Sequence, residues 1–371
     1  MKEIKGVYTS AAVFTDDIED YAAAQIKNIC DNPIFKDSRI RIMPDVHPGK
    51  YCTIGTAMTI KDKVIPYLVG VDIGCGMTCV HLKARNMEFQ KLDSVIAKRV
   101  PSGMKIRSEI HRFAEEAELD RLHCRKAVRK EKALLSLGTL GGGNHFIELD
   151  RAEDGSYYLV IHSGSRHLGV EAAEYYQKAA FAQCRENQIE VPFALAYAEG
   201  ELFENYVRDM EIIREFAALN RRCIADEIMK GMKWKELDRF DTVHNYISSE
   251  DGEYMLRKGA VSAKKGEKIL IPVNMKEGAL LCVGKGSREW NQSAPHGSGR
   301  IASRSEALNA HTVSEFKKEM KGIYCSSIGK ETLDEAPFAY RTMEAVQSRI
   351  GDTADVVQII RPVYNFKAGN E

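Results

Sequence analysis

The chain has 371 residues, of which 44% are hydrophobic, enough for one large domain or two ordinary domains. Lys and Arg together number 53, as do Asp and Glu, so the sequence lacks the basic excess of proteins that grip long nucleic acid. It contains no apolar stretch long enough to span a membrane, and its first six residues lack the apolar region expected of a signal peptide. Nine irregularly spaced cysteines form no disulfide framework, so we expect reduced thiols in a cytoplasmic protein.

The first part of the chain predicts short strands and two helices. A helix is expected over residues 16–31, because Pro33 follows it. Asn86 is the expected cap of a second helix that ends before Pro101. Residues 105–136 are charged and helical in pattern, and residues 44–49 form a loop. Apolar runs predict strands over residues 39–43, 52–60, 64–71 and 77–84.

The longest helical tract covers residues 170–237, and its apolar stripe at helical spacing is expected to be core: Phe203, Val207, Met210 and Ile213. A glycine-rich loop over 138–144 precedes it, and a helix is expected over 304–320. Further strands are predicted over residues 157–161, 268–271, 279–283 and 356–360. Strands and helices do not alternate regularly, which favours the α+β class over a doubly wound sheet.

Residues 69–77 combine an acid, a thiol and several glycines. Asp72 and Cys75 lie three residues apart, with Gly74 and Gly76 on either side of the thiol. Glycine permits positive φ and close approach of other groups. Such a turn can therefore direct a hard carboxylate oxygen and a bridging thiolate toward one point. A buried turn with an inert cysteine is the alternative interpretation.

Four histidines lie beside glycine, asparagine or serine rather than in charged or helical surroundings: His145, His162, His244 and His296. Imidazole is the commonest metal-ligating side chain. One carboxylate, one thiolate and three imidazoles would supply two adjacent divalent cations. The spacing matches no compact zinc finger, although thiolate and imidazole together ordinarily favour zinc.

Two glycine-rich loops, residues 141–143 and 297–299, each lie close to one of these histidines. Their backbone N–H groups can bind anionic oxygens, and Arg166 and Arg300, near such loops, can pair bidentately with phosphate. Neither loop matches the P-loop pattern, and no dinucleotide fingerprint is present. Glycine-rich loops alone are weak evidence for a phosphate site.

Five stretches, taken together and in order, resemble the motifs of RtcB-type RNA ligases. They are Met43-Pro44-Asp45-Val46-His47, Val71-Asp72-Ile73-Gly74-Cys75-Gly76, Gly141-Gly142-Gly143-Asn144-His145-Phe146-Ile147-Glu148, His162-Ser163-Gly164-Ser165-Arg166 and His296-Gly297-Ser298-Gly299-Arg300. The resemblance runs from about residue 39 to the C-terminus. It implies one α+β domain over 1–371, with mixed and antiparallel sheets around a dinuclear metal site and a helical insertion at about 170–237.

The resemblance also implies two manganese ions, GTP as cofactor, and His296 as the nucleophile that takes the GMP. Asp72, Cys75 and His145 would hold one ion, and Cys75, His162 and His244 the other. Residues near the reacting phosphates would be Asp45, His47 and Arg166. Residues around the nucleotide would be Asn144, His145, Phe146, Ile147, Glu148, His244, Asn245, Pro272, Val273, Asn274, Met275, Ala279, His296, Gly297, Ser298, Gly299 and Lys367.

By the same resemblance, Glu148 would select guanine by accepting its N1–H and N2–H groups. The residues from Val356 to Phe366 are rich in apolar side chains, which indicates that the end of the chain is docked. Docking would hold Lys367 at a fixed place, and the resemblance puts that place at the nucleotide.

The implied activity is joining of RNA 3′-phosphate or 2′,3′-cyclic-phosphate ends to 5′-hydroxyl ends, in RNA repair or tRNA splicing. An accessory activating protein is a further partner compatible with it. Two alternatives are a metal-dependent phosphoesterase that opens cyclic phosphates and a non-catalytic RNA-end binding protein. The phosphoesterase would need neither His296 nor Lys367. The binding protein would not need Asp72, Cys75 and all four histidines together.

Several positions depart from the family pattern. Val273 and Asn274 stand where Gly and Ser are usual, and Ala279 stands where a serine is common. Ser298 replaces the usual alanine of the His-Gly-Ala-Gly-Arg motif, and His167 follows Arg166 where a small residue is more usual. The catalytic set is complete, so we expect activity. The changes at 273, 274 and 279 fall on the wall of the nucleotide pocket and bear on GTP affinity and base selectivity.

Overall fold

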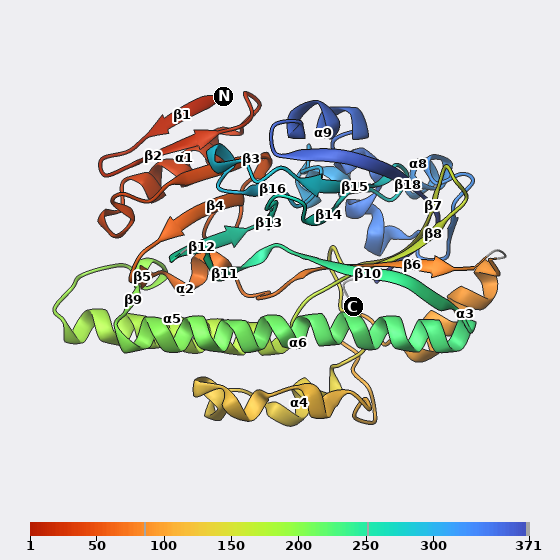
Figure 1. Ribbon diagram of the computed structural model, residues 1–371, viewed down its shortest axis with the longest axis horizontal. Helices are drawn as coiled ribbons and strands as arrows, with labels where there is room; N and C mark the ends of the chain where they lie inside the picture. The colour runs from red at the N-terminus through yellow and green to blue at the C-terminus, as the bar shows by residue number, and fades with distance from the viewer. Residues whose placement is uncertain (85–86, 251, 369–371) are drawn as a thin grey trace.

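The computed structural model describes the chain except residues 85–86, 251 and 369–371. Two large sheets lie side by side above a pair of long helices (Figure 1). The first sheet has the order β1-β2-β3-β4-β12-β11 and is antiparallel except where β2 meets β3. Its strands are β1 (Lys2–Lys5), β2 (Ser10–Val13), β3 (Ile40–His47), β4 (Ile54–Ile60), β11 (Asn245–Glu250) and β12 (Glu253–Lys258).

The second sheet has the order β10-β6-β8-β7-β18-β15-β14, and β17 (Tyr324–Cys325) pairs with β18 in parallel. Its other strands are β6 (Gly76–Lys83), β7 (Phe146–Ala152), β8 (Tyr157–Ser163), β10 (Lys235–Val243), β14 (Lys268–Asn274), β15 (Gly278–Gly284) and β18 (Ala354–Lys367). Two small pairs complete the described strands: β5 (Lys63–Val64) with β9 (Ala198–Glu199), and β13 (Ala260–Ser262) with β16 (Ser293–Pro295).

The helices flank these sheets. They are α1 (Asp20–Cys30), α2 (Pro66–Val69), α3 (Phe89–Arg99), α4 (Lys130–Leu135), α5 (His167–Glu186), α6 (Glu201–Met232), α7 (Arg304–Ala310), α8 (Val313–Glu319) and α9 (Met343–Ile350). The longest, α6, runs beneath both sheets and contacts β6, β8 and β11, while α4 lies on its far side (Figure 1). None of the helices among the described residues is long and apolar enough to cross a membrane.

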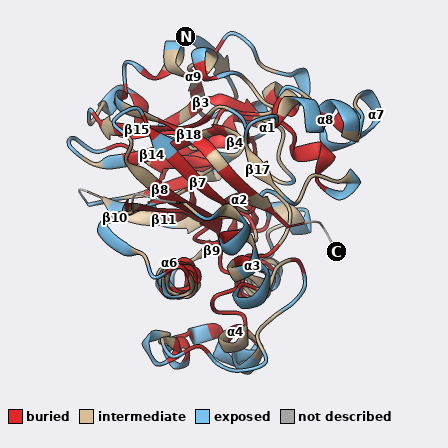
Figure 2. Cartoon of the chain, turned by 90° about the vertical axis from the view of Figure 1, so that its right-hand side faces the viewer, coloured by how far each residue is buried: buried red, intermediate tan, exposed pale blue. Residues whose placement is uncertain are grey.

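Strand β7 shows how the second sheet separates core from site. Ile147 and Leu149 point toward the helices and pack in one hydrophobic cluster with Ile224 of α6. Side chains alternate along a strand, so Phe146, Glu148 and Asp150 point to the opposite face. Figure 2 shows β7 and its neighbour β8 buried over most of their length, while β18 is buried mainly in its second half. Glu148 is therefore a buried carboxylate on the site-bearing face.

The α+β class is confirmed, and most predicted elements are present with shifted ends. The helix predicted over 16–31 is α1, and the tract 170–237 forms α5 and α6 with a break between them. Phe203, Met210 and Ile213 are buried and Val207 is half-buried, as expected for a core stripe. Asn86, the expected cap, lies outside the described residues, and Glu88 is the residue before α3.

Four sequence predictions are wrong. Residues 64–71 form no continuous strand, because Pro66 occupies the first turn of α2, a position that proline favours. Residues 44–47 belong to β3, where a register shift accommodates Pro44. Residues 105–136 form no continuous helix; they contain three short 3₁₀ turns and the short helix α4, with irregular chain between them. The helix predicted over 304–320 is divided by Thr312, which caps α8 through its side chain.

Candidate metal centre and the cavity beside it

The turn between α2 and β6 carries Asp72 and Cys75. Gly74 within it has a φ of +71°, and a Cβ there would lie 2.7 Å from the Cα of Arg214 in α6. Glycine is therefore required by both the conformation and the close approach of the helix. The Gly74 N–H donates to the carbonyl of Asn245 at 2.8 Å, which fixes the turn against the start of β11.

Strand pairing brings the histidines to this turn. His162 lies in β8, opposite Met77 of β6 on one side and Phe146 of β7 on the other. His145 immediately precedes Phe146, so the strand pairing brings the two histidines close together. His244 lies between β10 and β11, and its N–H donates to the carbonyl of Cys75 at 3.0 Å. Residues separated by about 170 positions in the sequence thus share one point of the fold.

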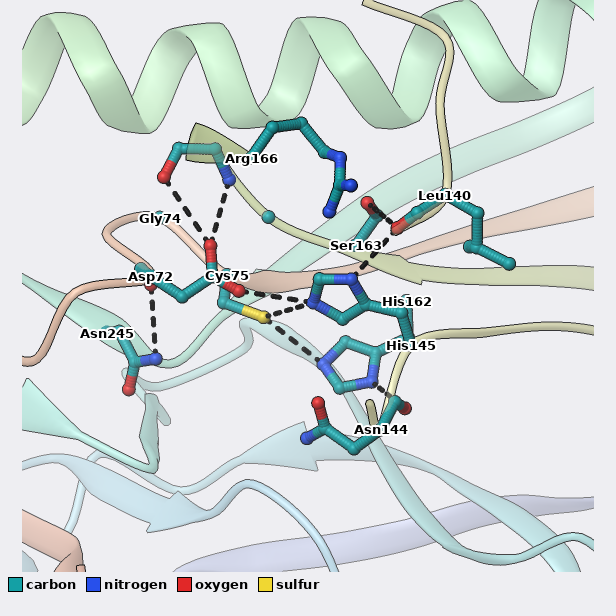
Figure 3. A network of polar contacts seen from close by, with 12 residues as sticks. Asp72, Gly74, Cys75, Leu140, Asn144, His145, His162, Ser163, Arg166 and Asn245 are labelled. Carbon is teal, nitrogen blue, oxygen red and sulfur yellow. Dashed lines mark hydrogen bonds and ion pairs between the residues drawn. The ribbon is translucent and has the colours of Figure 1, made fainter. Parts of the chain in front are cut away.

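The donor atoms form two groups that share the thiol. Figure 3 shows the first group, Asp72, Cys75 and His145, with His162 beside it. The Sγ of Cys75 lies 3.4 Å from Nε2 of His145 and 3.4 Å from Nε2 of His162. Nε2 of His145 is 3.1 Å from Oδ2 of Asp72, and Nε2 of His162 is 3.2 Å from Nε2 of His244. Within each group, Asp72–Cys75–His145 and Cys75–His162–His244, all donor atoms lie within 4.8 Å of one another.

The outer nitrogens of two rings fix their tautomers. Nδ1 of His145 lies 2.9 Å from the carbonyl of Leu140, and Nδ1 of His162 lies 3.1 Å from the carbonyl of Asn144. A carbonyl only accepts, so both Nδ1 atoms carry the proton and both Nε2 lone pairs face the thiol. This is the usual arrangement of metal-ligating imidazoles, and the residues present therefore fit a pair of divalent cations.

The electrostatics of the buried donors agree with that fit. Burial lowers the pKa of His162 and of His244 well below the usual range, which keeps both rings neutral. Burial raises the pKa of the Cys75 thiol, and a bound cation would reverse this because it stabilises the thiolate.

His296 stands beside the second group, held by Asp45. Its ring centroid is 4.7 Å from that of His244. Nδ1 of His296 lies 2.7 Å from Oδ2 of Asp45, which also accepts from the N–H of Gly297 at 3.2 Å. Asp45 is 2% exposed, so it presents a buried acceptor. The proton on His296 is therefore held on Nδ1, and the lone pair of Nε2 is left to react.

A cavity of about 430 Å³ opens beside His162 and His296. Twelve of the residues expected around the nucleotide line it: Asn144, Phe146, Glu148, Pro272, Val273, Asn274, Met275, His296, Gly297, Ser298, Gly299 and Lys367. His47 lines the same cavity, and burial lowers the pKa of its imidazole to about 4. The hydroxyl of Ser298 donates to the carbonyl of Val273 at 2.7 Å and ties the histidine loop to β14.

Five residues of the expected nucleotide set do not line this cavity. His145 and His244 belong to the metal centre. Ile147 packs in the core behind β7, and Ala279 lies in β15 opposite Pro272. Asn245 donates to the carbonyl of Asp72 at 3.2 Å and so supports a metal ligand. A direct nucleotide contact for these residues remains a prediction.

Charged residues from the last part of the chain complete the cavity wall; the sequence singled out Lys367 and Arg300 but not Glu335 or Arg304. The Glu335 carboxylate is 2% exposed and accepts from Nζ of Lys367 at 2.8 Å and from Arg304 at 2.9 Å. Arg300 donates to the same carboxylate at 3.2 Å, and the Tyr340 hydroxyl donates to it as well. Lys367 and Arg304 outweigh the effect of burial and lower the pKa of Glu335 to about 2.

Glu148 of β7 lies opposite Asn365 of β18 in the strand pairing. Its carboxylate accepts from Nδ2 of Asn365 at 2.5 Å. Burial raises the pKa of Glu148 to about 7, and burial together with the charge of Glu148 raises that of Asp150. Neither carboxylate oxygen of Asp150 has a hydrogen-bond partner meeting normal geometry among the described residues. The cavity therefore has a buried carboxyl group whose pKa is raised above its usual range.

Helix α6 supports the centre from behind, through two buried polar residues that a core stripe did not predict. Nδ2 of Asn220 donates to the carbonyls of Thr139 and Gly164, both at 3.1 Å. Arg221 is fully buried and donates to the carbonyl of Gly74 at 3.0 Å and to that of Ser163 at 3.1 Å. The occurrence of Asn220 and Arg221 within an apolar helical face is the sequence signal that could have predicted this supporting role.

The family model described as "tRNA-splicing ligase RtcB" matches residues 25–129 and 107–368. The chain is 31% identical to the RNA-splicing ligase RtcB of Escherichia coli strain K12, over 94% of this chain and 95% of that protein. It is 32% identical to the RNA-splicing ligase RtcB1 of a second Escherichia coli strain, with the same shares covered. Identity to the tRNA-splicing ligase RtcB of Aeropyrum pernix is 27%, over 96% and 93%.

Proposed function

Because the chain belongs to the RtcB family of RNA-splicing ligases, we propose that it is an RNA ligase dependent on GTP and manganese. It joins RNA 3′-phosphate or 2′,3′-cyclic-phosphate ends to 5′-hydroxyl ends in the cytoplasm, in RNA repair or tRNA splicing. The observation that carries the proposal is the placement of His296. Its ring is oriented by Asp45, lies next to His244 of the second metal-ligand group and lines a cavity of nucleotide size.

In the first step, Nε2 of His296 attacks the α-phosphorus of GTP. A P–N bond forms, the bond from that phosphorus to the bridging oxygen breaks, and pyrophosphate leaves. Asp45 keeps the proton on Nδ1 and stabilises the positive charge that the ring acquires. Lys367, Arg300 and Arg304 face the cavity and offset phosphate charge. Bound manganese ions would supply Lewis-acid stabilisation of the phosphate oxygens.

In the second step, an oxygen of the RNA 3′-phosphate attacks the GMP phosphorus, and the P–N bond breaks. The 5′-hydroxyl oxygen of the other RNA then attacks the activated 3′-phosphorus, and GMP leaves. The hydroxyl proton needs an acceptor, and neutral His47 lines the same cavity.

The test is incubation with labelled GTP and manganese, followed by denaturing electrophoresis and an RNA-joining assay. We expect an acid-labile label on the wild-type protein and none on His296→Ala, with equal metal content in both. Label on the His296→Ala variant would show that another residue is the nucleophile. Opening of cyclic phosphates without label or joining would support the phosphoesterase instead, and RNA binding without any turnover would support the binding protein.

A further inference from the structure

A second cavity, of about 340 Å³, reaches the metal centre from another direction. Asp72 lines it, whereas His162 and His296 line the first cavity. Arg166 belongs to the second cavity and Asn144 to the first, and Figure 3 shows them on opposite sides of His145 and His162. The metal centre therefore has two approaches, and the function proposed above assigns a ligand to only one of them.

The wall of the second cavity is rich in cations. Arg129, Lys132, Arg166 and His167 line it, against Asp72 and Glu171. Arg129 is paired with Glu171, and Asp72 is committed to the metal group. Lys132, which is half-buried, makes no ion pair with any residue that the structure describes. The cavity therefore holds cationic charge that no protein group offsets.

Backbone features add to this charge. The helix α5 is 20 residues long and begins at His167, so its free N–H groups and the positive end of its dipole face the cavity. The Arg166 guanidinium is held at this point by Thr139 Oγ1 at 3.2 Å and by the carbonyl of Gly103 at 3.1 Å. These are donors fixed in place before any ligand arrives.

The rim of the cavity is apolar on one side. Met104 lines it and is 79% exposed, which is unusual for so large an apolar side chain, and Ile106 is beside it. A ligand that fits this wall needs closely spaced negative charges and an apolar face. A single-stranded RNA end has both, because its phosphates alternate with unstacked bases. A free anion would leave Met104 and Ile106 uncovered.

We propose that the second cavity binds the 3′-terminal nucleotides of the RNA that carries the 3′-phosphate. The terminal phosphate lies toward Asp72 and Arg166, the next backbone phosphates contact Lys132 and Arg129, and the base covers Met104. RNA and guanine nucleotide then reach the two metal groups from different sides and need not exchange within one pocket. This assignment rests on the proposed ligase function.

The test compares Lys132→Glu with Lys126→Glu, a matched change in the same segment at an exposed lysine outside the cavity. A labelled oligonucleotide with a 3′-phosphate and no 5′-hydroxyl measures binding in the presence of manganese. We expect Lys132→Glu to weaken binding and raise the KM for this strand by about tenfold or more, while Lys126→Glu stays within about twofold. Adduct formation from labelled GTP should remain within about twofold in both.

Salt dependence gives a second reading, because each phosphate contact to a single strand contributes about 0.7 to the slope of log K against log salt. Lys132→Gln should lower that slope by about this amount, and it serves as well if Lys132→Glu does not fold. Equal binding by Lys132→Gln and wild type would overturn the assignment. Loss of affinity for the 5′-hydroxyl strand alone would overturn the choice of end. If the wild type itself joins no RNA, the failure lies with the proposed function.

Discussion

At the scale of single residues, the orientation of the His296 ring depends on the buried carboxylate of Asp45. His296 and Asp45 both came from motif positions, but Asp45 was expected near the substrate phosphate, and the structure places it on Nδ1 of His296. Its position 251 residues away is invisible to local pattern. Glu335 was missed for the same reason, because its three cationic partners come from distant segments.

Asp45→Asn tests the orienting role. The amide keeps the volume but removes the charge that stabilises the protonated ring, and its NH₂ group can face Nδ1 and favour the wrong tautomer. We expect adduct formation at His296 to slow by about a hundredfold or more, with metal content unchanged. Rapid-quench measurement with labelled GTP checks the rate. A wild-type rate would show that Asp45 does not orient the nucleophile.

Glu148 gives a pH-dependent prediction. Burial raises its pKa to about 7, so the carboxylate that can accept two guanine N–H groups prevails above pH 7 and is lost as pH falls through that value. The preference for GTP over ATP in adduct formation should therefore fall by about tenfold between pH 8 and pH 6, the worth of one charge-assisted hydrogen bond. Glu148→Gln should have a lower preference that does not change with pH. A preference in the wild type that is flat over this range would contradict the assignment.

At the scale of elements, the spacing of apolar residues correctly predicted the helices and strands that have one regular apolar face. Helix α6 and strands β14, β15 and β18 were found, because each buries one face against a neighbour. Strand β7 was missed, since its face toward the site carries Glu148 and Asp150 where a core strand would be apolar. The polar residues that face the cavity therefore hid the apolar pattern by which β7 could have been predicted.

The docked end of the chain was predicted from apolar content, and β18 extends to Lys367, which is 5% exposed. Lys367→Ala breaks one of the three ion pairs of Glu335, and Arg300 and Arg304 remain to compensate. We therefore expect a stability loss of about 1–3 kcal/mol and adduct formation slowed by at least about tenfold.

Two measurements separate the functional effect of Lys367→Ala from the structural one. Thermal melting and metal analysis report on the fold, and joining of RNA that already carries a 3′ guanylate reports on the later step. The later step should be kept, since it needs no GTP. Guanylation at the wild-type rate would return Lys367 to a purely structural role.

At the scale of the whole molecule, the five donors come from separate segments of the chain: the turn before β6, the start of β7, the end of β8 and the junction between β10 and β11. Cys75 is common to both groups, whereas His145 and His244 each belong to one. Cys75→Ala should therefore lose both metals, and His145→Ala or His244→Ala about one each. Elemental analysis of the three folded variants gives the stoichiometry. Equal losses in all three would contradict two sites joined by a shared thiolate.

The location of His244 has a mechanical consequence. It joins β10, the edge of the second sheet, to β11, the edge of the first, and its metal partners all lie on the second-sheet side. A cation bound there would cross-link the junction between the two sheets. Its removal would loosen this junction while leaving the hydrogen bonds within each sheet intact. In hydrogen–deuterium exchange, chelation should accelerate exchange around residues 243–247 and 72–76 before it affects the centre of β7 or β8. The rigidity of the connection between the two sheets would then depend on the concentration of available metal in the cell.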